Sequence, residues 1–84
     1  MKLTFSENSW QEYLYWQKND KKILKRINEL IKDIQGNKYE GIGKPEPLQH
    51  NLSGWGSRRI NHEHRIVYKI EEENVLIAQL RYHY

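Results

Sequence analysis

Ionisable side chains in the second half of the chain have the types and surroundings that acid–base chemistry requires. Glu46 lies between Pro45 and Pro47, whose rings restrict the backbone and would hold the carboxylate on a stiff segment, as a general base needs. His83 is the penultimate residue, and a histidine with an ordinary pKa of about 6.5 can donate a proton near neutral pH. Taken singly, each residue favours the simpler interpretation, in which Glu46 is an exposed loop residue and His83 a bystander at a chain end.

Two arginines complete the pattern, provided that the last strands pair in the register that the apolar residues favour. Residues 57–70 and 75–84 alternate as strands and are joined by a polar cluster. A three-residue turn over 72–74 would make one face of the hairpin wholly apolar, with the pairs Ile66–Leu80, Tyr68–Ala78 and Ile70–Leu76. The other face would then place Arg65 opposite Arg81, Val67 opposite Gln79 and Glu63 opposite His83. Directly opposed arginines favour a bound anion such as phosphate; alternatively, each turns into water or pairs with Glu63.

The first half of the chain supplies the elements that must position these groups. Residues 2–5 alternate as a short strand, Ser6 can cap a helix from Glu7, and Asp20 can cap a second helix that ends at Gly36-Asn37. An isoleucine-rich stripe on the second helix predicts a core face, and its lysines predict a solvated face, with RNA contact as the less favoured alternative. Residues 36–56 are rich in Gly, Pro, Asn and Ser and predict a long loop, which is uncommon in a small domain unless it is functional.

Composition limits the classes of function. A chain of 84 residues supports one domain, spanning residues 1–84, and the absence of cysteine excludes thiolate catalysis and disulfides and fits a cytoplasmic protein. The net charge of +3 favours an anionic partner, and no segment approaches the roughly 20 apolar residues of a membrane span. His62 and His64 alone do not make a metal site, and no glycine-rich loop has the context of a phosphate cradle, so we expect no metal and no cofactor.

A set of motifs that runs through the whole chain resembles the YoeB family of the RelE/ParE toxin superfamily. In the first half, the resemblance rests on Tyr13-Leu14-Tyr15-Trp16 and on residues 27–33. In the second half, it rests on Lys44-Pro45-Glu46-Pro47-Leu48, His50-Asn51-Leu52-Ser53-Gly54, Ser57-Arg58-Arg59-Ile60, Glu63-His64-Arg65 with Val67-Tyr68, and Arg81-Tyr82-His83-Tyr84. The resemblance implies an α+β fold, with two N-terminal helices packed on a twisted antiparallel sheet.

The resemblance also implies an activity, namely ribosome-dependent cleavage of messenger RNA in the A site, which inhibits translation. Glu46 would be the general base on the ribose 2′-hydroxyl, Arg65 would stabilise the charged phosphorane, His83 would protonate the leaving 5′-oxygen, and Tyr84 would orient the substrate. The residues expected to bind substrate are Arg59, Lys44, Arg58, Glu63 and Arg81. Such cleavage needs a base, an acid and a cation between them, and no metal.

The partners implied by the resemblance are a YefM-like cognate antitoxin, the 70S ribosome with its messenger RNA, and a second copy of the chain. Two positions depart from the family pattern in the loop expected to face RNA: Gln49 replaces a usual lysine, and Trp55-Gly56 replaces the usual aromatic pair. Three other interpretations remain open: a non-catalytic RNA-binding module, a toxin of the same fold that acts on another target such as a gyrase, and a structural interaction protein.

Overall fold

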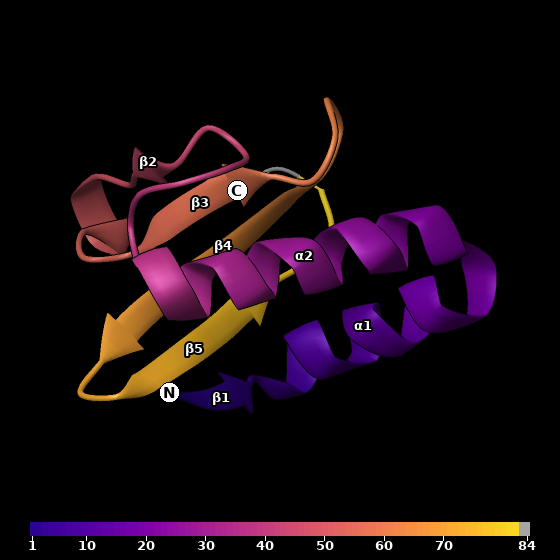
Figure 1. The fold of residues 1–84 in the computed structure, drawn as a ribbon, viewed down its shortest axis with the longest axis horizontal. Helices are drawn as coiled ribbons and strands as arrows, with labels where there is room; N and C mark the ends of the chain where they lie inside the picture. Colours follow the sequence, from indigo (N-terminus) through magenta and orange to yellow (C-terminus); the bar gives the residue numbers. More distant parts are fainter. Residues whose placement is uncertain (83–84) are drawn as a thin grey trace.

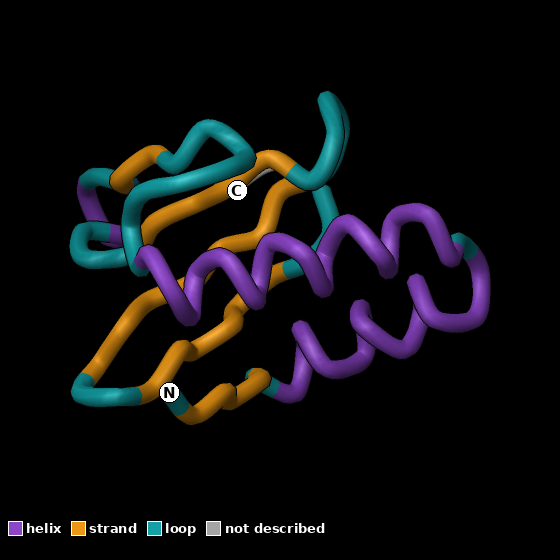
Figure 2. Tube along the Cα trace, viewed as in Figure 1, coloured by secondary structure: helices purple, strands orange, loops and turns teal. Residues whose placement is uncertain are grey.

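Two helices cover one face of a five-stranded sheet in the computed structural model, which describes residues 1–82 (Figure 1). The helices are α1 (Glu7–Asn19) and α2 (Lys21–Asn37), and a short 3-10 helix, η1, spans His50–Leu52. The strands are β1 (Lys2–Phe5), β2 (Glu46–Pro47), β3 (Gly56–Arg59), β4 (Arg65–Glu71) and β5 (Asn74–Gln79). The sheet order is β1-β5-β4-β3-β2, as the strands of Figure 2 show.

The expected fold class is confirmed, with one difference in the sheet. Strands β2 to β5 pair antiparallel, but β1 joins the sheet parallel to β5. The chain between β1 and β5 contains both helices and the other strands, which gives it the length that a parallel connection requires. The sheet is therefore mixed.

The helix boundaries follow the predicted caps. The Ser6 hydroxyl accepts a hydrogen bond from the Ser9 N–H, and the Asp20 carboxylate accepts from the N–H groups of Lys22 and Ile23. Both caps satisfy N–H groups that a helix cannot pair internally. The second helix ends at Asn37, as expected.

The core lies between α2 and the sheet. The isoleucine stripe of α2 is buried against β4 and β5, and Trp16 of α1 closes one side. The buried apolar residues of this cluster are Trp16, Ile27, Leu30, Ile31, Ile34, Ile60, Ile66, Tyr68, Val75, Ile77 and Leu80. Both helices thus cover one face of the sheet, and the other face carries Arg59 and Arg65.

The region 57–70, expected to be one strand, is a hairpin. The chain turns between β3 and β4, where the Asn61 side chain accepts hydrogen bonds from the N–H groups of Glu63 and His64. Asparagine stabilises turns in this way. The expectation of a single strand was therefore wrong, and the turn brings Arg59 directly opposite Arg65.

The register of the last hairpin also differs from the prediction. The turn contains two residues, Glu72 and Glu73, so Tyr68 pairs with Ile77 and Ile70 with Val75. A bulge beside Tyr68 then leaves Ala78 as an extra residue and restores the predicted pair Val67–Gln79. The predicted pairs near the turn were wrong because a bulge shifts the register by one residue.

Candidate active site

Two arginines face one another on the sheet surface that the helices leave open. Arg59 of β3 pairs directly with Arg65 of β4, and both side chains are only partly exposed. Opposed like charges are unfavourable in a sheet, and an anion between them would relieve the repulsion. The predicted pair Arg65–Arg81 was therefore wrong, because the residue opposite Arg65 is Arg59 of β3.

Glu46 lies on the same face. It pairs with Ser57, which pairs in turn with Val67, and directly opposite residues of a sheet share a face. Its carboxylate Oε2 is 4.0 Å from Nη1 of Arg65; the Glu46 side chain is 57% exposed and that of Arg65 is 12% exposed. A carboxylate accessible to solvent therefore lies beside a largely buried guanidinium.

The loop that carries Glu46 is fixed at Gly43. The Gly43 carbonyl accepts a hydrogen bond of 2.6 Å from the Arg59 N–H, and the residue has a φ of +82°. A Cβ atom here would come within 2.8 Å of Leu30 Cδ2 on α2, so only glycine fits. The predicted long loop is thus partly ordered, and β2 inside it holds Glu46 against β3.

Arg58, which was expected to bind substrate, is buried on the opposite face. Its side chain is 0% exposed and donates five hydrogen bonds, to the Asp33 carboxylate, the Tyr68 hydroxyl and three carbonyls, those of Lys38, Glu40 and Ile42. The hydrogen bond from Arg58 lowers the pKa of Asp33. Arg58 thus fastens the segment after α2 to the sheet, and no part of it is exposed to RNA.

Arg81 is also displaced from its predicted place. Its guanidinium lies 3.7 Å from the centre of the Tyr15 ring and 4.8 Å from that of Tyr82. The ladder between β4 and β5 ends at the Val67–Gln79 pair, so Arg81 is not opposite Arg65. Stacking on aromatic rings holds its charge against α1.

The remaining residues that were predicted to bind substrate or to act in catalysis lie in different parts of the chain. Lys44 is exposed at the start of the Glu46 segment, with a φ of +51°. Glu63 is exposed in the β3–β4 turn, 3.6 Å from Nε2 of His64. His83 and Tyr84 lie outside the described residues.

The chain just before His83 is held by contacts that the sequence did not predict. The Leu80 N–H donates to the Glu12 carboxylate, and the Leu80 carbonyl accepts from Nε1 of Trp16. The Tyr82 N–H donates to Nδ1 of His64. No local sequence pattern indicates these contacts, because each joins residues at least 18 positions apart.

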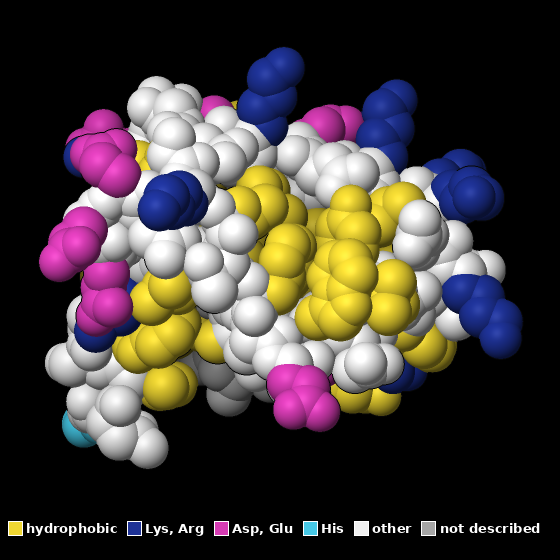
Figure 3. Space-filling model, turned by 90° about the horizontal axis from the view of Figure 1, so that it is seen from below, with side chains coloured by type: hydrophobic (Ala, Val, Ile, Leu, Met, Phe, Trp, Pro, Cys, Tyr) yellow, Lys and Arg dark blue, Asp and Glu magenta, His cyan; other side chains and the backbone are white. Residues whose placement is uncertain are grey.

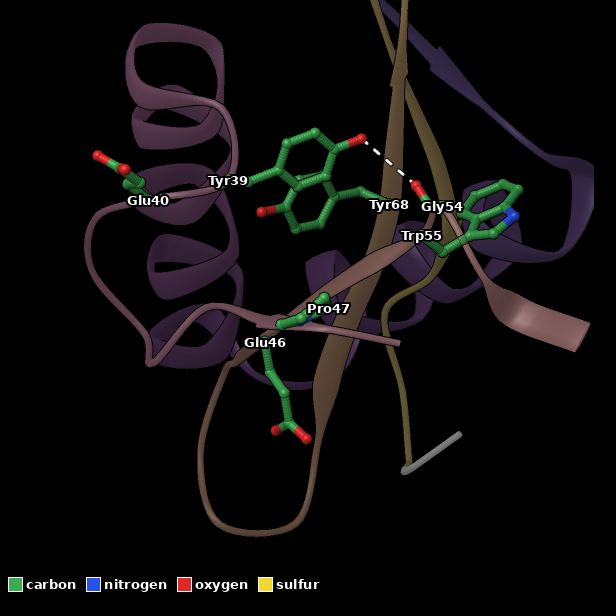
Figure 4. A pocket seen from close by; sticks show the side chains of 7 residues that line it. All are labelled: Tyr39, Glu40, Glu46, Pro47, Gly54, Trp55 and Tyr68. Atoms are coloured by element: carbon green, nitrogen blue, oxygen red, sulfur yellow. Dashed lines mark hydrogen bonds between the residues drawn. The ribbon is translucent and has the colours of Figure 1, made fainter. Parts of the chain in front are cut away.

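A hollow of about 490 Å³ lies at the β2 edge of the sheet (Figure 4). Tyr39 stacks on Tyr68 at 5.5 Å between ring centres, with Pro47 and Trp55 nearby. Figure 4 shows the Glu46 carboxylate pointing away from this aromatic pair. Glu46 lines this hollow and also lies beside Arg65, so the hollow adjoins the arginine face.

The arrangement on the arginine face could bind a phosphodiester and remove a proton beside it. Two guanidinium groups supply positive charge, and Glu46 supplies a carboxylate next to it.

Within residues 1–82, no group of three or more His, Cys, Asp or Glu side chains is placed to hold a metal ion. No helix among these residues is long and apolar enough to cross a membrane.

Comparison with known proteins identifies the class. The family model described as YoeB-like toxin of bacterial type II toxin-antitoxin system matches residues 5–84. Toxin YoeB of Escherichia coli (strain K12) is 62% identical over 84 residues, which cover 100% of both chains. The structure of a YoeB dimer from Staphylococcus aureus superposes with a TM-score of 0.94 at 53% identity, and a YoeB-YefM complex from the same organism gives 0.94 at 52%; each match covers 100% of this chain and 98% of the other.

These matches make the chain a toxin of a type II toxin–antitoxin system. It belongs to the YoeB-like toxin family. The resemblance noted in the sequence is confirmed over the full chain.

Proposed function

We propose that this toxin is an endoribonuclease that cuts messenger RNA in the ribosomal A site and so stops translation. One observation carries the proposal: Glu46, Arg65 and Arg59 lie together on the open face of the sheet. This grouping offers both a base and a site for a phosphate. The family match supports the proposal, because it assigns this grouping of residues to a toxin.

The reaction would proceed by attack of a ribose 2′-hydroxyl on the adjacent phosphorus. Glu46 takes the hydroxyl proton as the new O–P bond forms, and Arg65 stabilises the negative charge on the phosphorane. The bond to the 5′-oxygen then breaks, and His83 donates the proton that this oxygen needs. The products are a 2′,3′-cyclic phosphate and a free 5′-hydroxyl, and Tyr84 orients the substrate.

The other residues that were expected to bind substrate are given roles according to their positions in the structure. Arg59 would bind the same or a neighbouring phosphate from the opposite strand. Lys44 and Glu63 are exposed and lie two positions before Glu46 and Arg65, respectively, in the chain. Arg58 is assigned a structural role because it is fully buried. Arg81 is assigned to the C-terminal segment, where its guanidinium lies over Tyr15.

The proposed partners are an antitoxin, a second copy of the chain, and the ribosome in the cytoplasm. A YefM-like segment with acidic side chains would neutralise the arginine face, as a disordered segment can when it folds on a toxin. Figure 3 shows apolar side chains gathered on one face of the molecule. Leu3, Trp10, Leu14 and Tyr15 are the exposed apolar residues of β1 and α1, and such a patch suits an interface between copies.

Arg65→Met tests the proposed function. We expect discrete, ribosome-dependent cuts by the wild type and a rate about 10²–10³-fold lower for the variant, because one preorganised cation is removed from the developing charge. The cuts are mapped by primer extension on a message translated in a reconstituted system. Arg26→Met, a half-buried arginine of α2, is the matched control and should retain near wild-type cleavage.

Three outcomes would contradict the assignment. A wild type that binds the ribosome without cutting would indicate a binding module, and translation unaffected by the wild type would indicate another target. Cleavage lost in Arg26→Met but kept in Arg65→Met would move the RNA contact to the helix face.

A further inference from the structure

We propose that His64 is a positioning residue of this site, which fixes the backbone from which residue 83 extends. The inference rests on the proposed function, in which residue 83 supplies the proton to the leaving group. His64 does not contact the reacting groups itself. It acts through Tyr82, the last described residue before the assigned acid.

His64 is a buried histidine with a defined hydrogen-bonding role. It is 6% exposed, its ring packs edge-on against Trp16 at 4.8 Å between ring centres, and Nδ1 accepts a 2.8 Å hydrogen bond from the Tyr82 N–H. An accepting Nδ1 carries no proton, so the ring proton lies on Nε2, which faces the Glu63 carboxylate at 3.6 Å. Contacts with Trp16, Tyr82 and Glu63 therefore fix the orientation of the ring.

Tyr82 needs this anchor because its backbone adopts an unfavourable conformation. Its φ of +64° lies in the left-handed region, which residues other than glycine rarely occupy. Its N–H is held by His64, and its carbonyl accepts from the Arg65 N–H at 3.1 Å and from Nε2 of Gln79 at 3.2 Å. Strained residues persist where such surroundings over-determine them, and they are frequent at active sites.

His64 also connects two parts of the proposed chemistry. It directly precedes Arg65, the first residue of β4, so the chain at the start of this strand carries the phosphate-stabilising guanidinium and also holds the C-terminal backbone. Glu12 and Trp16 anchor Leu80, two residues earlier, whereas Nδ1 of His64 and the Arg65 N–H bind Tyr82 itself. Loss of the His64 acceptor would therefore release the segment nearest the acid.

Two substitutions separate this role from simple packing. His64→Phe keeps an aromatic ring against Trp16 but has no acceptor for the Tyr82 N–H. His64→Asn places Oδ1 close to the position of Nδ1 and restores an acceptor while losing the ring. His62→Phe, an exposed histidine in the same turn, is the matched control.

The test combines single-turnover cleavage of ribosome-bound message, ribosome affinity and amide hydrogen exchange of Tyr82. We expect His64→Phe to cleave about 10²-fold more slowly with unchanged affinity, because small displacements of a reacting group cost rates of this size. It should lose the slow exchange of the Tyr82 amide, and His64→Asn should recover both slow exchange and most of the rate. His62→Phe should match the wild type.

The proposal is overturned if His64→Phe cleaves at the wild-type rate, or if a folded His64→Asn is as slow as His64→Phe. Thermal unfolding of each variant shows whether it is folded. A wild type that does not cleave would remove the proposed function instead. In that case, slow Tyr82 exchange that disappears in His64→Phe would still support His64 as the anchor of the C-terminal backbone.

Discussion

Glu46→Ala is expected to lower the cleavage rate by about 10²–10⁴-fold and to leave the fold intact, because it removes the proposed general base. The side chain is 57% exposed, and its ion pair with Arg65 spans 4.0 Å, so little stability depends on it. Single-turnover cleavage of ribosome-bound message measures the rate. Thermal unfolding of the same preparations measures the stability.

Two further variants distinguish the loss of a base from the loss of a contact. Glu46→Gln keeps the shape and polarity of the side chain but cannot take a proton, so it should be nearly as slow as Glu46→Ala. Glu29→Ala, exposed on α2, is the matched control and should cleave like the wild type. An active Glu46→Gln enzyme would show that the residue binds substrate without acting as the base.

Arg58→Met is expected to destabilise the fold by about 3–5 kcal/mol, because it breaks the hydrogen-bond network around a fully buried guanidinium and removes the cation beside the partly exposed Asp33 carboxylate. The Asp33 carboxylate and the carbonyls of Lys38, Glu40 and Ile42 would all lose a donor. Domains of this kind are stable by only about 5–15 kcal/mol, so the variant should be close to unfolding. Urea denaturation followed by circular dichroism gives the free energy of unfolding.

The free energy of unfolding of Arg58→Met should be measured at neutral pH. Arg58 lowers the pKa of Asp33 in the folded state below its ordinary value of 3.8. The pair therefore contributes its full stability above that value and loses it as the pH falls through the lowered pKa. Arg26→Met is the matched control, and an Arg58→Met variant as stable as this control would show that Arg58 is not a structural residue.

The helices could be predicted from the sequence because their signals are local. Ser6 and Asp20 cap the helices at the positions expected, and the isoleucine stripe of α2 faces the core. Gly36-Asn37 marks the end of α2 within one residue of the observed boundary. Caps and helical periodicity depend on residues a few positions apart, which a single sequence displays.

The strand pairing could be predicted only in part because it depends on bulges and turns. The apolar residues at 66, 68 and 70 suit more than one register, and nothing local marks Ala78 as the bulged residue. An arginine opposite Arg65 was predicted, but the predicted residue was Arg81 and the observed one is Arg59. Asn61 was the missed signal, because a turn-forming residue at this position divides the region into two strands.

Glu46 was singled out by its flanking prolines, and its proposed role as the base came from the family resemblance, whereas the positions of Arg58 and His64 depend on distant residues. Arg58 and Arg59 are neighbours on one strand and must face opposite sides of the sheet, so only one could face substrate. That alternation could have assigned Arg58 to the core face. His64 gave no such signal, since its contact with Tyr82 joins residues 18 positions apart.

A message that carries one 2′-deoxynucleotide on the 5′ side of the cut phosphate tests whether cleavage occurs by attack of a 2′-hydroxyl. We expect the wild-type toxin to cut the all-ribose message, leaving a 2′,3′-cyclic phosphate, and to leave the deoxy-substituted message uncut at that position. Cleavage of the deoxy-substituted message at the same position and rate would contradict the claim, because the proposed nucleophile would be absent.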